Sequence, residues 1–299
     1  MSSATKQPII EIRLATLTEQ PSIARLAARA FHNDVLFGHI IHPYRHAYRS
    51  HMSRYWLSRN LIAHLDPCHR INVAVTTSGS RKERIVGVIH WSRIAPSAAD
   101  NYAAGWGYAW WFPQRILHFL VSNVVWLAYR TIWRNRAASP AQECIIEASE
   151  ASGCLDHIWD PAKNRCPSWY IESMAVDPDW QGKGVGRLLV EEGLKLAEQE
   201  GVSASVIAAD GKEDFYRKCG FVTGPVGRSG MGDEKKNPLW AVPGGLLFFR
   251  EAPGKRMAAE AEDKEVDECV KWLRKDMEKG WRSSWLESGT GRDLGRGAG

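Results

Sequence analysis

The feature that most constrains this 299-residue chain is a glycine-rich turn between an apolar segment and an amphipathic one. Residues 181–186 read QGKGVG and come shortly after the apolar segment 168–177, which Pro178 ends. Residues 184–199 then repeat their apolar positions at helical spacing. The glycines let the main chain turn tightly and direct successive N–H groups inward, and the helix start adds the positive end of its dipole. This strand–turn–helix unit therefore predicts a cradle for an anion such as a pyrophosphate.

Two better-known phosphate-binding loops do not fit this turn. A dinucleotide-binding fingerprint needs a third glycine at the position where this chain has Arg187. A Walker loop needs Ser or Thr after its lysine, whereas here Gly184 follows Lys183. What remains is the pattern Q-x-x-G-x-G before a helix, with the element FYRKCGF at 215–221 further along the chain.

Composition and charge are those of an ordinary globular protein, and they narrow the range of functions. The chain is 44% hydrophobic and 24% charged, with a net charge of +5. Its 34 acidic residues dilute the positive field, so without a dense basic patch we expect no nucleic-acid partner. The six cysteines include no C-x-x-C pair, which argues against a metal site and a disulfide framework.

We expect a soluble, cytoplasmic protein without a membrane span. Residues 1–7 are polar and lack the apolar core of a secretory leader. The longest apolar stretch, residues 116–133, is interrupted by His118, Asn123 and Arg130, so it is too broken for a spanning helix.

Hydrophobic periodicity predicts an α/β (α+β) fold, a mixed central sheet flanked by helices. Strands are expected at 9–14, 71–76, 84–91, 168–177, 203–209, 221–226 and 239–250, and helices after Thr18 and at about 44–65, 114–135, 184–199 and 211–219. We assign residues 1–252 to one domain with a Trp-rich insert at about 97–167, and residues 253–299 to a charged helical extension and a flexible tail.

The tryptophans of the insert leave three interpretations open. They pack the core of the insert, form an apolar acceptor pocket or lid, or form a face for a membrane surface or a second copy of the chain. Packing is the simplest of the three. Four histidines at positions 39, 42, 46 and 51 have uneven spacing and no cysteine or carboxylate partners, so we interpret them as packing or solvated residues and expect no metal.

Together, these motifs resemble the acyl-CoA-binding core of the GNAT superfamily of N-acetyltransferases. Residues 181–186 match its Q/R-x-x-G-x-G/A loop, and residues 215–221 match its later F-Y-x-K-x-G-F element. The resemblance covers 168–250 well and 9–95 weakly, and the long insert is similar to inserts in fungal members. It implies the GNAT fold, in which two neighbouring strands of the central sheet splay apart.

The resemblance also implies how the co-substrate, acetyl-CoA, would be held. In the family, the strand before the loop bulges, and its free amides pair with the pantetheine arm and the thioester carbonyl. Residues Met174, Ala175 and Val176 occupy that place here. The diphosphate would lie on the loop and helix start, residues Gln181, Gly182, Lys183, Gly184, Val185, Gly186 and Arg187, with Asp210 and Gly211 as further contacts.

Two side chains match catalytic positions of the family. Glu172 would take the proton of the attacking amine, directly or through a water, with Asp177 and Asp210 as weaker alternatives. The Tyr216 phenol would protonate the departing thiolate, which is chemically feasible because a phenol has a higher pKa than a thiol. A structural role, as a salt-bridged strand glutamate or a packed aromatic residue, is the alternative for each. Beside Glu172, Trp169 and Tyr170 are expected to contact the acceptor.

The sequence is therefore interpreted as an acetyl-CoA-dependent N-acetyltransferase that moves acetyl to a primary amine by direct transfer in a ternary complex. The expected acceptor is a small, partly apolar amine. Two alternatives stay open: a non-catalytic acyl-CoA-binding or interaction module on the same fold, and a protein or peptide N-acetyltransferase. A homodimer also stays open.

Overall fold

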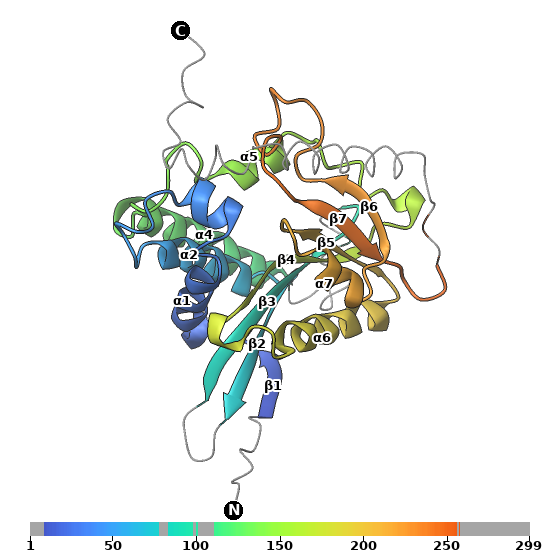
Figure 1. The fold of residues 1–299 in the computed structure, drawn as a ribbon, viewed down its shortest axis with the longest axis horizontal. Helices are drawn as coiled ribbons and strands as arrows, with labels where there is room; N and C mark the ends of the chain where they lie inside the picture. The colour runs from blue at the N-terminus through green and yellow to red at the C-terminus, as the bar shows by residue number, and fades with distance from the viewer. Residues whose placement is uncertain (1–8, 78–82, 98–99, 101–110, 256, 258–299) are drawn as a thin grey trace, which may run out of the picture.

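A single mixed sheet with helices on both faces forms the centre of the molecule (Figure 1). This computed structural model describes residues 9–77, 83–97, 100, 111–255 and 257. Within them the sheet has seven strands in the order β1-β2-β3-β4-β5-β7-β6. The strands are β1 (Ile9–Leu14), β2 (His69–Thr77), β3 (Arg84–Ile94), β4 (Ser168–Val176), β5 (Ser203–Ala208), β6 (Thr223–Arg228) and β7 (Leu246–Arg250). The helices are α1 (Gln20–Ala30), α2 (Met52–His64), α4 (Trp111–Thr131), α5 (Ile145–Ala151), α6 (Val185–Glu200) and α7 (Glu213–Lys218), with a π-helix at Val35–Ile41 and single 3-10 turns at Leu17–Glu19, Pro161–Lys163 and Pro178–Trp180.

The sheet changes direction at its centre. Strands β1 to β4 are antiparallel neighbours, β4 runs parallel to β5, and β7 is antiparallel to both β5 and β6. A parallel pair needs a crossover connection, and α6 supplies it between β4 and β5. The predicted mixed α/β sheet flanked by helices is therefore confirmed.

Apolar side chains form a separate core on each face of the sheet. Trp91, Leu189 and Phe248 lie fully buried in the core beneath α6. Ile23 and Val73 belong to the other core, between the sheet and helices α1 and α2. Because each fully buried aliphatic or aromatic side chain contributes roughly 1.5–3 kcal/mol, these contacts hold α6 firmly on the sheet. The start of α6 therefore has a set position next to the end of β4.

The central pair of strands separates along its length. Parallel pairing of β4 with β5 starts at Ser168 and Ser203 and ends at Ile171 and Val206. However, β4 continues to Val176 and β5 to Ala208. The last residues of β4 therefore have no partner on the β5 side, which gives the splayed strand pair that the resemblance implies.

Two predicted boundaries are wrong, and a polar side chain explains each. The helix predicted from residue 44 begins at Met52, because residues before it form turns around Arg45, whose buried guanidinium donates to the Gly38 carbonyl at 2.8 Å. The strand predicted over 239–250 begins at Leu246, because the buried Arg228 side chain binds the main-chain carbonyls of Trp240 and Val242. These carbonyls therefore form no ladder with a neighbouring strand.

The insert is partly described. It contains α4, close to the expected helix at 114–135, and α5, a short helix that the periodicity did not predict. Two tryptophans of the insert, at 106 and 110, lie outside the described residues, so the interpretations of their role stay predictions. The same holds for the expected helical extension and tail from residue 258 onward. The division of the chain into a domain of residues 1–252 and an extension at 253–299 stays a prediction.

Candidate active site

The glycine-rich turn adopts a main-chain conformation that only glycine takes easily. Gly182 has φ 73° and Gly184 has φ 82°, both in the left-handed region. A Cβ atom at either position would meet nothing within 4 Å. Backbone conformation, and not lack of space, therefore explains these two glycines.

Gly186 is required for a different reason, namely close packing. A Cβ atom there would lie 3.3 Å from Cζ of Phe215 and 3.6 Å from Cε of Met174. The first turn of α6 thus packs against both α7 and β4. This contact fixes the start of α6 beside the opening between β4 and β5.

The start of α6 is free of competing side chains and carries positive charge. No side chain caps Gly184, and the first turn of the helix contains no acidic residue. Lys183 lies 5.0 Å above the Trp180 ring, and Arg187 pairs with Glu191 at 2.7 Å, which raises the pKa of the Arg187 guanidinium. The first amides of the helix and its positive dipole end are therefore available to an anion.

The loop before α6 is tied back onto β4. Gln181 donates its Nε2 amide to the Val176 carbonyl at 3.1 Å. The buried Asp177 carboxylate accepts from Arg29 and Arg84, each at 3.1 Å. These bonds explain why glutamine begins the motif, and they give Asp177 a structural role instead of leaving it free as a base.

The open edge of β4 presents main-chain amides to the gap. Asp177 donates its N–H to Val86 on β3 at 2.9 Å, and residues of a strand turn their N–H groups to alternate edges. The amides of Val176 and Met174 therefore point away from β3, toward the gap, whereas that of Ala175 points to β3. Of the three residues expected to offer amides, two face the opening.

β4 has its bulge at Glu172, two residues before the expected place. His90 pairs with Ser173 and Trp91 with Ile171, so Glu172 is the extra residue. A bulge re-aims the side chain that it carries. The Glu172 carboxylate is exposed and accepts a hydrogen bond from the Ser92 hydroxyl at 2.7 Å.

Further acidic groups surround Glu172 on this face of the sheet. Burial and the neighbouring Glu172 carboxylate raise the pKa of Glu150 on α5, and Glu147 adds to this effect. Arg59 of α2 forms an ion pair with Glu147. The combined field is negative and suits a cationic ligand.

Tyr216 lies on α7, which packs against β5 and the start of α6. It is 8% exposed and packs edge-on against Phe215 and Phe221. Burial raises the pKa of its phenol, so the group stays protonated through neutral pH. Burial raises the pKa of Tyr170 on β4, and the neighbouring Glu172 carboxylate adds to this effect.

One expected acceptor contact, Trp169, has other surroundings. Trp169 lies in the core beneath α6, 4% exposed, and donates Nε1 to Glu200 at 3.1 Å. The structure therefore does not bring it together with Glu172. Asp210 and Gly211 form the turn after β5, where Gly211 has φ 74°.

Sequence reasoning missed Ser92, Arg59 and Glu150 as neighbours of the site. No local pattern marks them, because the bond from Ser92 to Glu172 spans 80 positions and depends on strand pairing. Only a prediction of the β3–β4 register, including the bulge, could have found Ser92.

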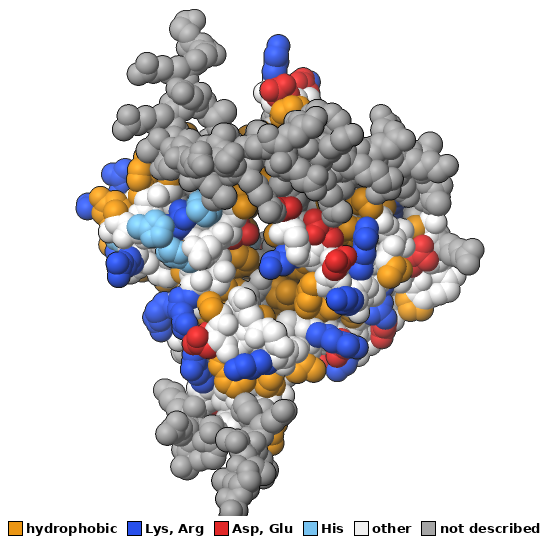
Figure 2. All heavy atoms as spheres, in the orientation of Figure 1, with side chains coloured by type: hydrophobic (Ala, Val, Ile, Leu, Met, Phe, Trp, Pro, Cys, Tyr) orange, Lys and Arg blue, Asp and Glu red, His pale blue; other side chains and the backbone are white. Residues whose placement is uncertain are grey.

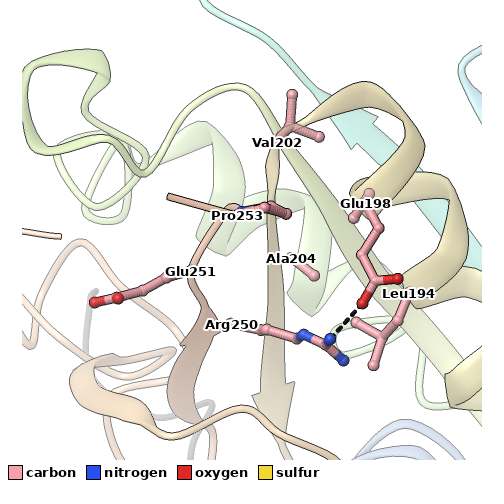
Figure 3. A pocket seen from close by; sticks show the side chains of 8 residues that line it. Leu194, Glu198, Val202, Ala204, Arg250, Glu251 and Pro253 are labelled. Atoms are coloured by element: carbon pink, nitrogen blue, oxygen red, sulfur yellow. Dashed lines mark hydrogen bonds and ion pairs between the residues drawn. The ribbon is translucent and has the colours of Figure 1, made fainter. Parts of the chain in front are cut away.

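A pocket of about 140 Å³ lies elsewhere, between the last turns of α6 and strands β5 and β7 (Figure 3). Arg250 lines it and forms an ion pair with Glu198. It is far along α6 from the glycine turn, so we assign it no part in the chemistry.

Among the described residues no cluster of His, Cys, Asp or Glu could hold a metal ion. None of the described helices has the length and apolar character needed to cross a membrane.

Comparison with known proteins gives matches around this site. Residues 140–223 match the family model of the acetyltransferase (GNAT) domain. Over 62 residues, 20% of this chain, it is 34% identical to an uncharacterized N-acetyltransferase, ycf52, of Gracilaria tenuistipitata, and 37% identical to the chloroplastic GCN5-related N-acetyltransferase 2 of Arabidopsis thaliana. These matches span only 34% and 24% of those relatives. A crystal structure described as histone acetyltransferase HPA2 and related acetyltransferase from Corynebacterium glutamicum aligns at 16% identity and a TM-score of 0.45, over 86% of this chain and 99% of that one. None of these comparisons tests the similarity to fungal members.

Proposed function

Because residues 140–223 match the family model of the acetyltransferase (GNAT) domain, we propose that the chain transfers acetyl from acetyl-CoA to a primary amine. Transfer would be direct, within a ternary complex. The observation that carries this proposal is the gap between β4 and β5 beside the uncapped start of α6. This arrangement places an anion cradle, at the start of α6, next to the free main-chain amides at the end of β4. Only the short loop between β4 and α6 separates the two.

Acetyl-CoA fits this arrangement as a substrate. Its diphosphate would lie on the main chain of Gln181–Arg187, where Gly182 and Gly184 have no Cβ to obstruct the approach. The pantetheine arm of acetyl-CoA would follow the open edge of β4, where the amides of Met174 and Val176 would be its hydrogen-bond donors. Ala175, Asp210 and Gly211 would border the same opening. An amide directed at the thioester oxygen would stabilise the developing oxyanion, an effect worth roughly 3–4 kcal/mol in other enzymes.

The two side chains at the opening suit the two proton transfers. The amine nitrogen would attack the thioester carbon while Glu172 accepts its proton, directly or through a water. The carbon–sulfur bond would then break as the carbon–nitrogen bond is completed, and Tyr216 would give its proton to the thiolate. Burial supports this role because it keeps Tyr216 protonated until that step. Ser92 would hold the Glu172 carboxylate in place.

Charge around the opening favours a cationic acceptor. Glu172 raises the pKa of Glu150, which reports that carboxylates crowd this face. A protonated amine entering beside Tyr170 would relieve that repulsion. It would release one proton to solvent to become the neutral nucleophile, and it would pass the second to Glu172 as it attacks. We therefore propose a small amine as the acceptor, rather than an acidic or neutral compound.

Thiol release from acetyl-CoA, measured over a panel of small amines and peptides, tests the proposal. We expect turnover with cationic amines, and a fall of roughly 10²–10⁴ for Tyr216→Phe with unchanged coenzyme A binding. Tyr44→Phe, at an exposed tyrosine, is the matched control and should keep full activity. Bound coenzyme A without release for any acceptor would indicate a binding module. Release with peptides alone would indicate a peptide N-acetyltransferase.

A further inference from the structure

Helix α4 exposes an unusual number of large apolar side chains. Seven of them are between 47% and 67% exposed: Ile116, Leu117, Phe119, Leu120, Val124, Trp126 and Leu127. Directly after the helix, Ile132 is 77% and Trp133 39% exposed. A monomeric soluble protein rarely leaves so many neighbouring apolar side chains in water, and such a patch marks an interaction site.

The side of α4 that faces the protein is partly polar. The helix packs on α2, with Val125 buried and His118 3.9 Å from Asp66. The remaining faces carry the seven exposed residues. The large apolar side chains of α4 therefore face mostly away from α2, and they need a covering of their own.

Charge on this surface has a single sign. No Asp or Glu occurs between Ile116 and Arg136, whereas arginines stand at 130, 134 and 136. Arg130 lies 4.7 Å above the ring of Trp126, so an exposed cation and an exposed aromatic ring share one face. In Figure 2, Lys, Arg and His side chains lie among hydrophobic and uncharged ones over the region of α1 and α2.

The segment before α2 extends the same surface. Arg54 donates to the Arg134 carbonyl at 3.0 Å, and the Arg136 amide donates to the His51 ring at 3.1 Å. These bonds bring Tyr44, Tyr48 and Arg49, all exposed, next to the end of α4. We call this surface, residues 116–136 with 44–49, the α4 surface.

We propose that the α4 surface binds a lipid bilayer that contains anionic phospholipid, with α4 lying flat in the interface. The apolar side chains would enter the boundary of the acyl chains, the aromatic rings would lie at headgroup depth, and the arginines would meet lipid phosphates. A second copy of the chain complements this surface less well, because it would bring arginines against arginines with no carboxylate between them. The lipid supplies the missing negative charge.

Co-sedimentation of the full chain with vesicles tests this inference without any acetyl transfer. Vesicles are made of phosphatidylcholine alone or with about one quarter phosphatidylserine. We expect at least about tenfold more bound protein on the anionic vesicles, falling at high salt.

Substitutions at exposed positions assign the binding to the α4 surface. Leu120→Asp with Leu127→Asp should abolish vesicle binding, and Arg130→Gln with Arg134→Gln should remove its dependence on phosphatidylserine. Val222→Asp is the matched control, because Val222 is 71% exposed on another part of the chain, and it should bind as the wild type does. Circular dichroism checks that all variants are folded.

Three outcomes would overturn the proposal. The first is no preference for anionic vesicles, and the second is equal loss of binding in the Val222→Asp control. The third is a dimer in solution that Leu120→Asp with Leu127→Asp converts to a monomer, with no vesicle binding by the wild type. Because none of these readouts uses acetyl-CoA, failure here is independent of the proposed function.

Discussion

Gly193 lies where α6 packs directly on Trp91 of β3, and its replacement by alanine tests that packing. A Cβ atom at this position would lie 2.1 Å from Cε2 and Nε1 and 2.5 Å from Cζ2 of Trp91. Trp91 is fully buried in the core beneath α6, so its ring cannot move into solvent. The helix would have to rise from the sheet, and the start of α6 would move with it.

Two opposing effects set the size of the change. Alanine is favoured over glycine in a helix by about 1 kcal/mol. Overpacking a core costs about 1–3 kcal/mol, and contacts far inside van der Waals distance lie at the upper end. We therefore expect Gly193→Ala to lower the free energy of unfolding by about 2 kcal/mol, which is roughly 3 °C in Tm for a chain of this size.

Urea unfolding of Gly193→Ala, with and without Trp91→Leu, measures both effects. In the Trp91→Leu background the added methyl finds space, so the helix preference should make the same substitution neutral or stabilising. We expect an interaction energy between the two sites of about 2 kcal/mol. Equal or greater stability of Gly193→Ala in the wild-type background would refute the close approach of α6 to β3.

Three further changes have defined outcomes. Ser92→Ala removes the hydrogen bond to Glu172, which is worth roughly 1 kcal/mol, so it should lower kcat about fivefold. The KM for acetyl-CoA should stay unchanged. An unchanged kcat would argue against Glu172 as the base. Burial lowers the pKa of His42 from 6.5 to about 4, so the unfolded chain binds a proton first as the pH falls. Between these two pH values the free energy of unfolding should therefore drop by about 1.4 kcal/mol for each unit of falling pH. Urea unfolding at a series of pH values should show a shallower slope for His42→Gln. Gly184→Ala and Gly201→Ala place alanine at φ 82° and 65° in open space, so each should cost about 1–2 kcal/mol of stability by calorimetry, and a clear difference between them would contradict the backbone argument.

Local chemistry explains what could be predicted from the sequence. The cradle at residues 181–186 depends on a turn, its glycines and the start of a helix. All of these lie within a few positions of one another, so the local sequence alone predicts the cradle. The order of strands and helices along the chain likewise follows from apolar periodicity. The mixed sheet follows from that order of elements.

Long-range pairing explains what could not be predicted. The bulge at Glu172 and its bond to Ser92 arise from the register of β3 with β4, which no short pattern encodes. The late start of α2 depends on the buried guanidinium of Arg45, which binds a carbonyl seven residues earlier. A basic residue in an amphipathic pattern gives no sign that it will be buried.

The central claim is that the main chain at the start of α6 holds the diphosphate of acetyl-CoA. Calorimetric titration of coenzyme A into the wild type, Gly184→Ala and Gly201→Ala tests it most directly. Both glycines lie at ends of α6 with positive φ and free surroundings, so both variants carry similar strain. We predict a binding isotherm that weakens at least about tenfold in Gly184→Ala and stays unchanged in Gly201→Ala, since only the first crowds the anion cradle. No heat with the wild type, or equal loss in both variants, would contradict the account.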